Sequence, residues 1–470
     1  MAFANFFDHL RVYTPISGGS MAHLQNHPTV LRFRQERAIQ STEDFPRLAA
    51  TTLRDLCLDS GADDVGFVSI DRAELDNQRA EILENFPWAR SLISIVCRMN
   101  REPIRSPARS VANLEFHHTV DHADDAAHTI VTALEAQGVR AANPASGFPM
   151  EVERFPGKSW IISHKPVAVA AGLGQMGIHR NVIHPRFGNF ILLGTIVTDA
   201  VISAEDKPID YNPCLECKLC VAACPVGAIS PSGDFDFAAC FTHNYREFMG
   251  GFNDWVETLV SSNDAGEYYE RTTASETASM WQSLSFGASY KAAYCIAVCP
   301  AGDDVIAPFL TNRAGFLKEV VKPLQDKVET IYVSTETTAA YVRRRFPHKH
   351  VKRVGSGIRF SSVEAFVKSL PRVFRPTAAE GVNAVYHLVF SGAEDYAATV
   401  SIGDGPDSRK RVTITEGCVG HADLRISADS RTWLGIVAGD RTPTWALVRR
   451  KLRLRGSLRL MKVFRACFAA

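Results

Sequence analysis

A chain of 470 residues with 46% hydrophobic and 22% charged residues has the composition of a globular protein and is too long for a single core. Its formal net charge of +1 gives no overall field that would recruit nucleic acid, so we expect no nucleic-acid partner. Because the start of the chain lacks a signal-like pattern and residues 190–201, the most apolar stretch, are interrupted by polar residues, we expect a cytoplasmic protein.

The first 205 residues divide into a weakly patterned leader, residues 1–50, and an α/β domain, residues 51–205. Helical spacing of apolar residues over residues 44–60 precedes two strand-like runs, residues 61–70 and 90–99. An amphipathic helix is predicted over residues 128–139, with Gly138 at its end. Apolar, glycine-punctuated segments follow up to residue 199. We expect this domain to bind a cofactor or substrate.

Three further parts follow along the chain. Residues 206–310 are rich in cysteine and carry a polar and aromatic insert at residues 241–294. Residues 311–375 contain a strand and then a helix, which predicts a small α/β connector. Residues 376–470 contain short alternating strands, a tryptophan-bearing helix, another strand and a last helix, which predicts an α+β domain. The predicted fold class is therefore an α/β and α+β multidomain protein.

The strongest chemical signal is the spacing of the cysteines, because seven of the 11 lie between residues 214 and 299. The run C-x2-C-x2-C-x3-C-P is the bacterial ferredoxin pattern, in which the fourth cysteine binds a different cluster from the first three. A second Cys-Pro pair follows about 75 residues later and is expected to complete the first cluster. Zinc is the less expected alternative. The predicted ligands of the first 4Fe–4S cluster are Cys214, Cys217, Cys220 and Cys299.

A second cluster is predicted from Cys224, Cys240 and Cys295. A complete second run would place a cysteine at position 292, where this chain has Ala292. The second centre is therefore a 4Fe–4S or 3Fe–4S cluster, unless it is labile or missing; a non-cysteine ligand such as His243 or Tyr294 remains an alternative. The scattered cysteines are expected to be buried apolar residues. They are Cys57, Cys97, Cys418 and Cys467.

Residues 163–199 (SHKPVAVAAGLGQMG…LLGTIVTD), followed by CLECKLCVAACPVGAI, resemble epoxyqueuosine reductases and reductive dehalogenases. The resemblance covers roughly residues 50–305. It implies a flavin-reductase-like α/β domain, in which a corrinoid or a flavin could bind, above a ferredoxin-like double-cluster module. By position it also implies a cofactor-facing role for His117. The acidic proton donor of the reductases has no match here, since its place falls near Gly157.

Residues 376–468 are similar to sterol-carrier-protein domains, on the segments VSIGDG, GHADLRISADSRTWLGIVAGD and KLRLRGSLRLMKVF. The similarity implies a five-stranded sheet with helices that enclose an apolar tunnel for a hydrophobic or lipid-like molecule. After Asp440 the chain has nine basic residues and no acidic one. This pattern fits either peripheral contact with an anionic membrane or an edge strand protected by charge.

Other candidates lie in the segment before the cysteines. Gly172, Gly174 and Gly177 match G-x-G-x-x-G, but the context favours a loop that lets the backbone approach a cofactor over a dinucleotide fold. Lys165 and His164 are candidate catalytic groups that could donate a proton or bind an anion.

Taken together, the sequence predicts an iron–sulfur oxidoreductase. Electrons from a ferredoxin or flavodoxin would pass through the clusters to a cofactor or hydrophobic substrate. The alternative is a non-enzymatic electron-transfer or lipid-binding protein with a degenerate active site, which Ala292 favours.

Overall fold

The computed structural model describes residues 25–36, 45–152, 155, 160–405 and 410–468, and it divides into the units Met1–Pro46 and Arg47–Ala470. The described part of the first unit contains α2 (Pro28–Glu36). The rest of the expected leader before residue 45 lies outside the described residues. All further elements belong to the second unit.

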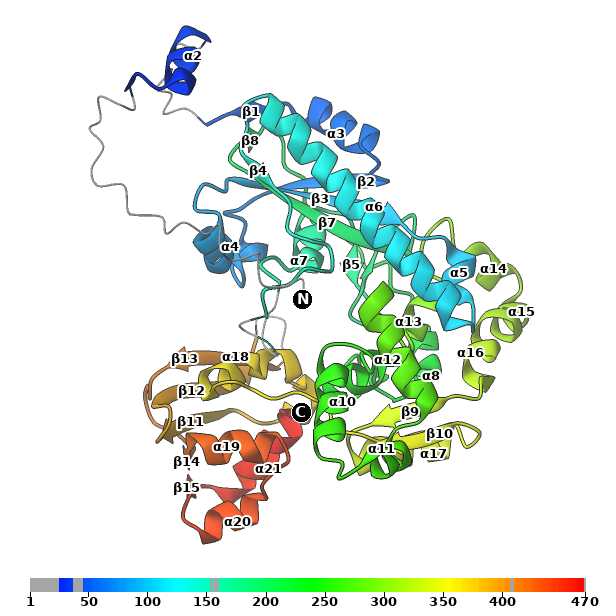
Figure 1. The fold of residues 1–470 in the computed structure, drawn as a ribbon, viewed down its shortest axis with the longest axis vertical. Helices are drawn as coiled ribbons and strands as arrows, with labels where there is room; N and C mark the ends of the chain where they lie inside the picture. The colour runs from blue at the N-terminus through cyan, green and yellow to red at the C-terminus, as the bar shows by residue number, and fades with distance from the viewer. Residues whose placement is uncertain (1–24, 37–44, 153–154, 156–159, 406–409, 469–470) are drawn as a thin grey trace, which may run out of the picture. The chain divides into compact units, whose positions relative to one another are not determined.

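A four-stranded sheet, in the order β2-β3-β7-β4, forms the centre of the first domain (Figure 1), and all its neighbouring strands are antiparallel. Alternate side chains of the strand β3 lie in different hydrophobic cores. Ile93 and Ile95 lie on one face of the sheet and Leu92 on the other. The strands are β2 (Asp64–Ser69), β3 (Ser91–Arg98), β4 (Ala141–Ala142) and β7 (Ile191–Thr198).

Helices cover both faces of this sheet. α3 (Ala50–Asp59) and α6 (Arg109–Ala136) pack on the first face, and α4 (Arg79–Asn85), η1 (Ala73–Leu75) and α7 (His164–Ala170) on the second. The segment before Gly172 is thus helical, which removes the strand that a dinucleotide-binding turn requires. The remaining short strands of the domain are β1 (Arg47–Leu48) with β8 (Val201–Ile202), and β5 (Gln175–Met176) with β6 (Val182–Ile183).

The long helix α6 begins 19 residues before the predicted start at residue 128. Its buried stripe includes Ala112, Phe116 and Ala123, spaced four and seven residues apart. Histidines and aspartates between these positions mask the stripe in the sequence. α6 therefore reaches from the sheet to the cysteine-rich module (Figure 1).

The cysteine-rich module is built from short helices joined by loops. β9 and α17 of the predicted connector share a hydrophobic core with Cys220 and Cys224, so the connector forms part of the wall of this module. β9 and β10 pair in parallel. The elements are α5 (Arg101–Arg105), α8 (Leu219–Ala223), α9 (Phe237–Asn244), α13 (Tyr294–Ala297), α14 (Ala307–Thr311), α15 (Arg313–Phe316), η3 (Leu317–Val321), α16 (Lys322–Asp326), β9 (Thr330–Val333), α17 (Glu336–Arg345) and β10 (His350–Arg353), with α10 (Gly250–Val260), α11 (Ala265–Arg271) and α12 (Ala274–Phe286) in the insert.

The last domain is a five-stranded sheet in the order β13-β12-β11-β14-β15, as the sequence predicts. Its strands pair antiparallel except β11 with β14, and its helices bury one face of the sheet in a single core. The strands are β11 (Ala384–Ser391), β12 (Tyr396–Asp404), β13 (Lys410–Glu416), β14 (Leu424–Asp429) and β15 (Leu452–Gly456). The helices are α18 (Val363–Val373), η4 (Pro376–Ala379), α19 (Ser430–Val437), α20 (Pro443–Val448) and α21 (Leu458–Cys467).

Three of the four scattered cysteines are buried as expected, namely Cys57, Cys97 and Cys467. The expectation is wrong for Cys418, which is exposed in the turn between β13 and β14. Among the described residues, no helix is both long and apolar enough to cross a membrane.

Gly188 connects the first domain to the loop that follows Cys299. Its φ is +65°, and a Cβ at this position would lie 1.9 Å from the carbonyl oxygen of Ala301. We expect Gly188→Ala to destabilise the protein by more than about 2 kcal/mol, because it adds this clash to the cost of a left-handed backbone. Gly138→Ala is the matched control, since Gly138 also has a positive φ but no atom within 4 Å of the added Cβ. Urea denaturation tests the prediction, and equal losses in both variants would contradict it.

Candidate iron–sulfur and cofactor site

Four cysteine side chains line one small cavity, together with Ile178, His179 and Pro300. Three come from the loop before α8 and its first turn, and the fourth follows α13 about 80 residues later in the chain. The sequence-predicted ligand set of the first cluster is thus brought together. We call it the four-cysteine site, and its members are Cys214, Cys217, Cys220 and Cys299.

The two Cys-Pro segments have the same backbone design. Lys218 (φ +61°) begins α8, and Ala293 (φ +57°) begins α13, in each case as a left-handed residue before a short helix. Counting from these residues, Cys220 corresponds to Cys295, and Ala292 takes the position that Cys217 has in the first segment. The position of the missing cysteine is therefore retained in the backbone, although its thiol is absent.

A second group of cysteines lies next to the first, and we call it the three-cysteine site: Cys224, Cys240 and Cys295. The Cys240 thiol interacts electrostatically with the other two, and Cys295 also with Cys220 of the four-cysteine site. Burial raises the pKa of Cys220 and of Cys295 to about 12, so neither thiol ionises at neutral pH without a bound cation. Both sites are suited to thiolates that are stabilised by iron.

Ala292→Cys should supply the missing fourth ligand of the three-cysteine site. Ala292 is 6% exposed, and its backbone N–H donates to Asn244, so the new thiol would be held at a fixed buried position. We expect the variant to bind about one more iron atom per chain and to lose any electron paramagnetic resonance signal of an oxidised 3Fe–4S centre. Spectra and iron content identical to the parent protein would show that position 292 does not face the second cluster.

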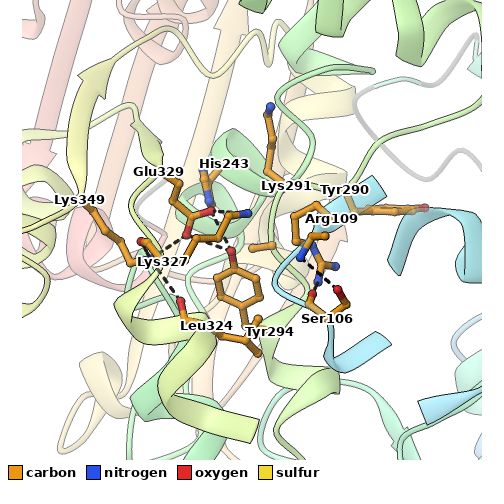
Figure 2. Close-up of polar contacts among 12 residues, drawn as sticks. Ser106, Arg109, His243, Tyr290, Lys291, Tyr294, Leu324, Lys327, Glu329 and Lys349 are labelled. Carbon is orange, nitrogen blue, oxygen red and sulfur yellow. Dashed lines mark hydrogen bonds and ion pairs between the residues drawn. The ribbon is translucent and has the colours of Figure 1, made fainter. Parts of the chain in front are cut away.

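The two non-cysteine alternatives for the fourth ligand, Tyr294 and His243, differ in their hydrogen bonds (Figure 2). The Tyr294 hydroxyl donates to both carboxylate oxygens of Glu329, at 2.9 and 2.8 Å. His243 Nδ1 accepts from the backbone N–H of Tyr332 at 3.3 Å, which places the proton on Nε2. Burial lowers the pKa of His243 to about 4, and the charges around its ring come from Glu329 and nearby lysines. Tyr294 is thus bonded away from the cysteines, whereas His243 Nε2 is buried and has no hydrogen-bond partner among the described residues.

Lys165 of α7 is exposed, yet its ammonium group is surrounded by protein, and this desolvation lowers its pKa. Nζ donates to the Arg180 carbonyl at 2.9 Å and to Asn181 Oδ1 at 2.8 Å. It also interacts electrostatically with Cys295 and Cys240. Lys165 therefore lies in the first domain beside the three-cysteine site.

The neighbouring His164 has a structural environment. Nδ1 lies 2.9 Å from the Thr195 hydroxyl and Nε2 lies 3.1 Å from the Ala145 carbonyl, so Nε2 donates and Nδ1 accepts. Burial lowers the pKa of His164, which keeps the ring neutral. Both ring nitrogens are bonded inside the domain. The hydrogen bond to Thr195 links α7, which carries Lys165, to the strand β7.

The predicted cofactor-binding glycines contact the chain itself. A Cβ on Gly172 would meet the Lys207 carbonyl at 2.5 Å, and one on Gly174 the Ile183 carbonyl at 2.4 Å. Gly177 is similarly close to the side chains of His179 and Ile183. His117 Nε2 bonds to the Ala288 carbonyl at 2.8 Å. The space next to each of these residues is therefore filled by other parts of the chain.

A cavity of about 380 Å³ lies next to His164 in the first domain, and sequence reasoning did not find it. Its wall includes two carboxylates, Asp124 and Glu151, and the indole of Trp160. Gly157, where the resemblance places the proton donor, lies outside the described residues. Glu151 is an acidic residue that borders this cavity, and the sequence analysis did not single it out.

Among the described residues, no three His, Cys, Asp or Glu side chains are close enough together to hold a single metal ion. A cubane has different requirements, since its cysteines bind different iron atoms and stand around the cluster rather than meeting at one point. The thiols of the four-cysteine site, which line one cavity, fit the larger group.

Comparisons with known proteins agree with this chemistry. The model of the 4Fe-4S binding domain family matches residues 207–230. Epoxyqueuosine reductase of Bacillus cereus is 35% identical over 79 residues, which cover 17% of this chain and 20% of that protein. The Escherichia coli enzyme is 29% identical over 105 residues, covering 22% and 27%. The chain thus spans about a fifth to a quarter of the length of these curated relatives.

Two solved structures are similar at low identity. A catabolic reductive dehalogenase has a TM-score of 0.34 at 14% identity, with 62% of this chain and 35% of that chain covered. An epoxyqueuosine reductase solved with a tRNA stem loop has a TM-score of 0.28 at 17% identity, with 41% and 56% covered. The family match and the curated relatives support a 4Fe–4S iron–sulfur protein that is similar in part to epoxyqueuosine reductases.

Proposed function

We propose that this chain is an iron–sulfur oxidoreductase that passes electrons through two clusters to a cofactor or hydrophobic organic substrate in the first domain. The four-cysteine site would hold the first 4Fe–4S cluster, and the three-cysteine site the second, as a 3Fe–4S or 4Fe–4S centre. A ferredoxin or flavodoxin would supply the electrons. When bound in the first domain, a corrinoid or flavin would supply the group that accepts electrons from the clusters.

The observation that carries this proposal is the position of Lys165. The residue is exposed at the surface of the first domain, and its desolvated ammonium group interacts with Cys240 and Cys295 of the three-cysteine site. A substrate beside Lys165 would therefore be close to the second cluster. The role we assign to Lys165 is to bind an anionic group of the substrate or to deliver a proton to it. The desolvation that lowers its pKa makes proton transfer near neutral pH easier.

The last domain would present the hydrophobic substrate, as its similarity to sterol-carrier-protein domains implies. An apolar recess supports this role. It is lined from α9, which carries Cys240, and from α18 of the last domain. Phe241, Phe366 and Leu370 are among its wall residues. The recess has a volume of about 40 Å³, so it would take only the end of a lipid-like chain, next to a helix that contributes a cluster ligand.

A second candidate is an electron carrier without catalytic activity, and Ala292 is the observation that favours it. The missing thiol leaves the second cluster with three cysteine ligands. A centre of this kind can store or relay an electron without substrate chemistry.

Single-turnover reoxidation separates the candidates. The anaerobic protein is reduced with photoreduced flavodoxin, and the return of cluster absorbance is followed after addition of a lipid extract or, separately, a tRNA pool. We expect the lipid extract to reoxidise the wild-type protein and Lys165→Gln to slow this step without loss of iron. If only the tRNA pool reoxidises the protein, the substrate is a nucleic acid and not the hydrophobic molecule that we propose. If neither fraction reacts, the carrier is the correct function.

A further inference from the structure

Two arginines four residues apart in the sequence, on two successive helices, have buried guanidinium groups with unpaired donors. Arg105 is the last residue of α5, and Arg109 is the first residue of α6. For both, Nε and Nη2 are buried and have no hydrogen-bond partner among the described residues. A buried N–H without an acceptor costs about 1–3 kcal/mol, and more when the group is charged. An anion bound next to these N–H groups would accept their hydrogen bonds and remove this cost.

Arg105 is directed to the four-cysteine site. Its guanidinium lies between the rings of Phe190 and Phe316, 5.3 and 5.6 Å from their centroids. The side chain is 12% exposed, and its ion-pair partner Glu102 is 86% exposed, so water screens that pair. The charge of Arg105 also interacts with the Cys299 thiol. This cation is therefore held in an apolar environment beside one ligand of the first cluster.

Arg109 has the same relation to the three-cysteine site (Figure 2). Its guanidinium lies 5.4 Å from the ring centroid of Tyr294, the residue before Cys295. It donates only a long hydrogen bond, 3.4 Å, to the Ser106 carbonyl, and its charge interacts with Cys295. The nearest carboxylate, Glu329, is already bonded to Tyr294 and paired with two lysines. Those lysines more than balance the charge of Glu329, so Arg109 has no anion of its own.

The geometry points to Arg105 and Arg109 as positioning residues for the two clusters, which direct their unpaired N–H groups and positive charge to cluster sulfurs. Arg105 acts on the four-cysteine cluster and Arg109 on the three-cysteine cluster. Each raises the reduction potential of its own cluster. The inference rests on the proposed function. It adds the two side chains whose effect on the reduction potentials determines the order in which the clusters accept electrons.

The physical reason is that reduction adds one negative charge to a cluster. A cation in a medium of low dielectric constant stabilises the more anionic, reduced form. Hydrogen bonds to the sulfurs act in the same direction, and both are recognised determinants of cluster potential. An anionic cluster would in turn satisfy the donors that are otherwise unpaired in the protein.

Redox titrations followed by electron paramagnetic resonance test this inference in the full-length anaerobic protein. We expect Arg105→Met and Arg109→Met each to weaken electron affinity about tenfold or more at its own cluster. A tenfold change corresponds to about 59 mV for a one-electron couple. The other cluster should shift less. Arg105→Lys and Arg109→Lys, which keep the charge, should recover part of the loss.

Arg101→Met is the matched control, because Arg101 is an exposed arginine one turn earlier on α5. It removes the same charge and should leave both potentials unchanged. Unchanged potentials in all four test variants, or equal shifts of both clusters, would overturn the inference. If a methionine variant fails to assemble its cluster, the lysine variant is used instead. A shift of the reduction potential at its own cluster that exceeds the shift at the other cluster supports the inference, and no shift or an equal shift overturns it. A wild-type protein without clusters would instead refute the proposed function.

Discussion

Replacing Cys299 with alanine should remove the first cluster, so that the iron content falls by about four atoms per chain. Cys299 is the ligand that comes from the second Cys-Pro segment, and it is 7% exposed in the wall of the cavity that the other three cysteines line. Without it, one iron of a cubane has no protein ligand. Anaerobic purification, followed by iron and acid-labile sulfide analysis and visible absorbance, measures the loss.

The matched control is Cys418→Ser. Cys418 is exposed in the last domain and lies in neither cysteine site, so we expect its replacement to leave the iron content unchanged. If Cys299→Ala retains the iron and sulfide of the parent protein, the ligand set of the first cluster is wrong.

Glu329→Gln should destabilise the protein by about 3–5 kcal/mol, the cost of removing one partner from a buried ion pair. Lys349 is 1% exposed and donates to Glu329 at 2.8 Å, and Lys327 lies 3.2 Å from the other carboxylate oxygen. Glutamine keeps the shape of the side chain but leaves both ammonium groups without an anion. Urea denaturation of the variant and the parent protein gives the difference.

The pH dependence of this loss has a definite sign. Burial alone would raise the pKa of Glu329, but the two lysines lower it below its usual range. The stabilisation is therefore complete above the unfolded-state pKa, about 4.3, and is lost as the pH falls through the folded-state pKa. The difference between variant and parent should shrink only under acid conditions.

A surface carboxylate provides the comparison for both measurements. Glu336 is 62% exposed and pairs with Arg343 at 2.7 Å. Because water screens such a pair, Glu336→Gln should cost less than about 1 kcal/mol. If the two glutamine variants lose the same stability, the buried network of Figure 2 does not hold the module together.

Much of the fold could be predicted because its strands have clear patterns. Runs rich in β-forming residues predicted β2 and β3, and the order of short strands predicted the last sheet. The early start of α6 was missed because histidine and aspartate residues interrupt its apolar stripe. The helical conformation before Gly172 was missed because VAVA is apolar at every position and its period cannot be determined.

The candidate site was predictable where spacing along the chain carries the chemistry. The run from Cys214 to Cys224 forces three thiols together within one loop and turn, and the second Cys-Pro pair predicted Cys299. Contacts between distant segments gave no such signal. Arg109 and the Glu329 network depend on how α6 and the connector pack against α13, which no local pattern encodes.

Native mass spectrometry of the anaerobically prepared wild-type chain tests the central claim most directly, because it counts iron and sulfide on each molecule. We predict a mass increase equal to one 4Fe–4S cluster together with a second centre of three or four iron atoms. A chain that carries only zinc, or neither iron nor sulfide in stoichiometric amount, would contradict the account.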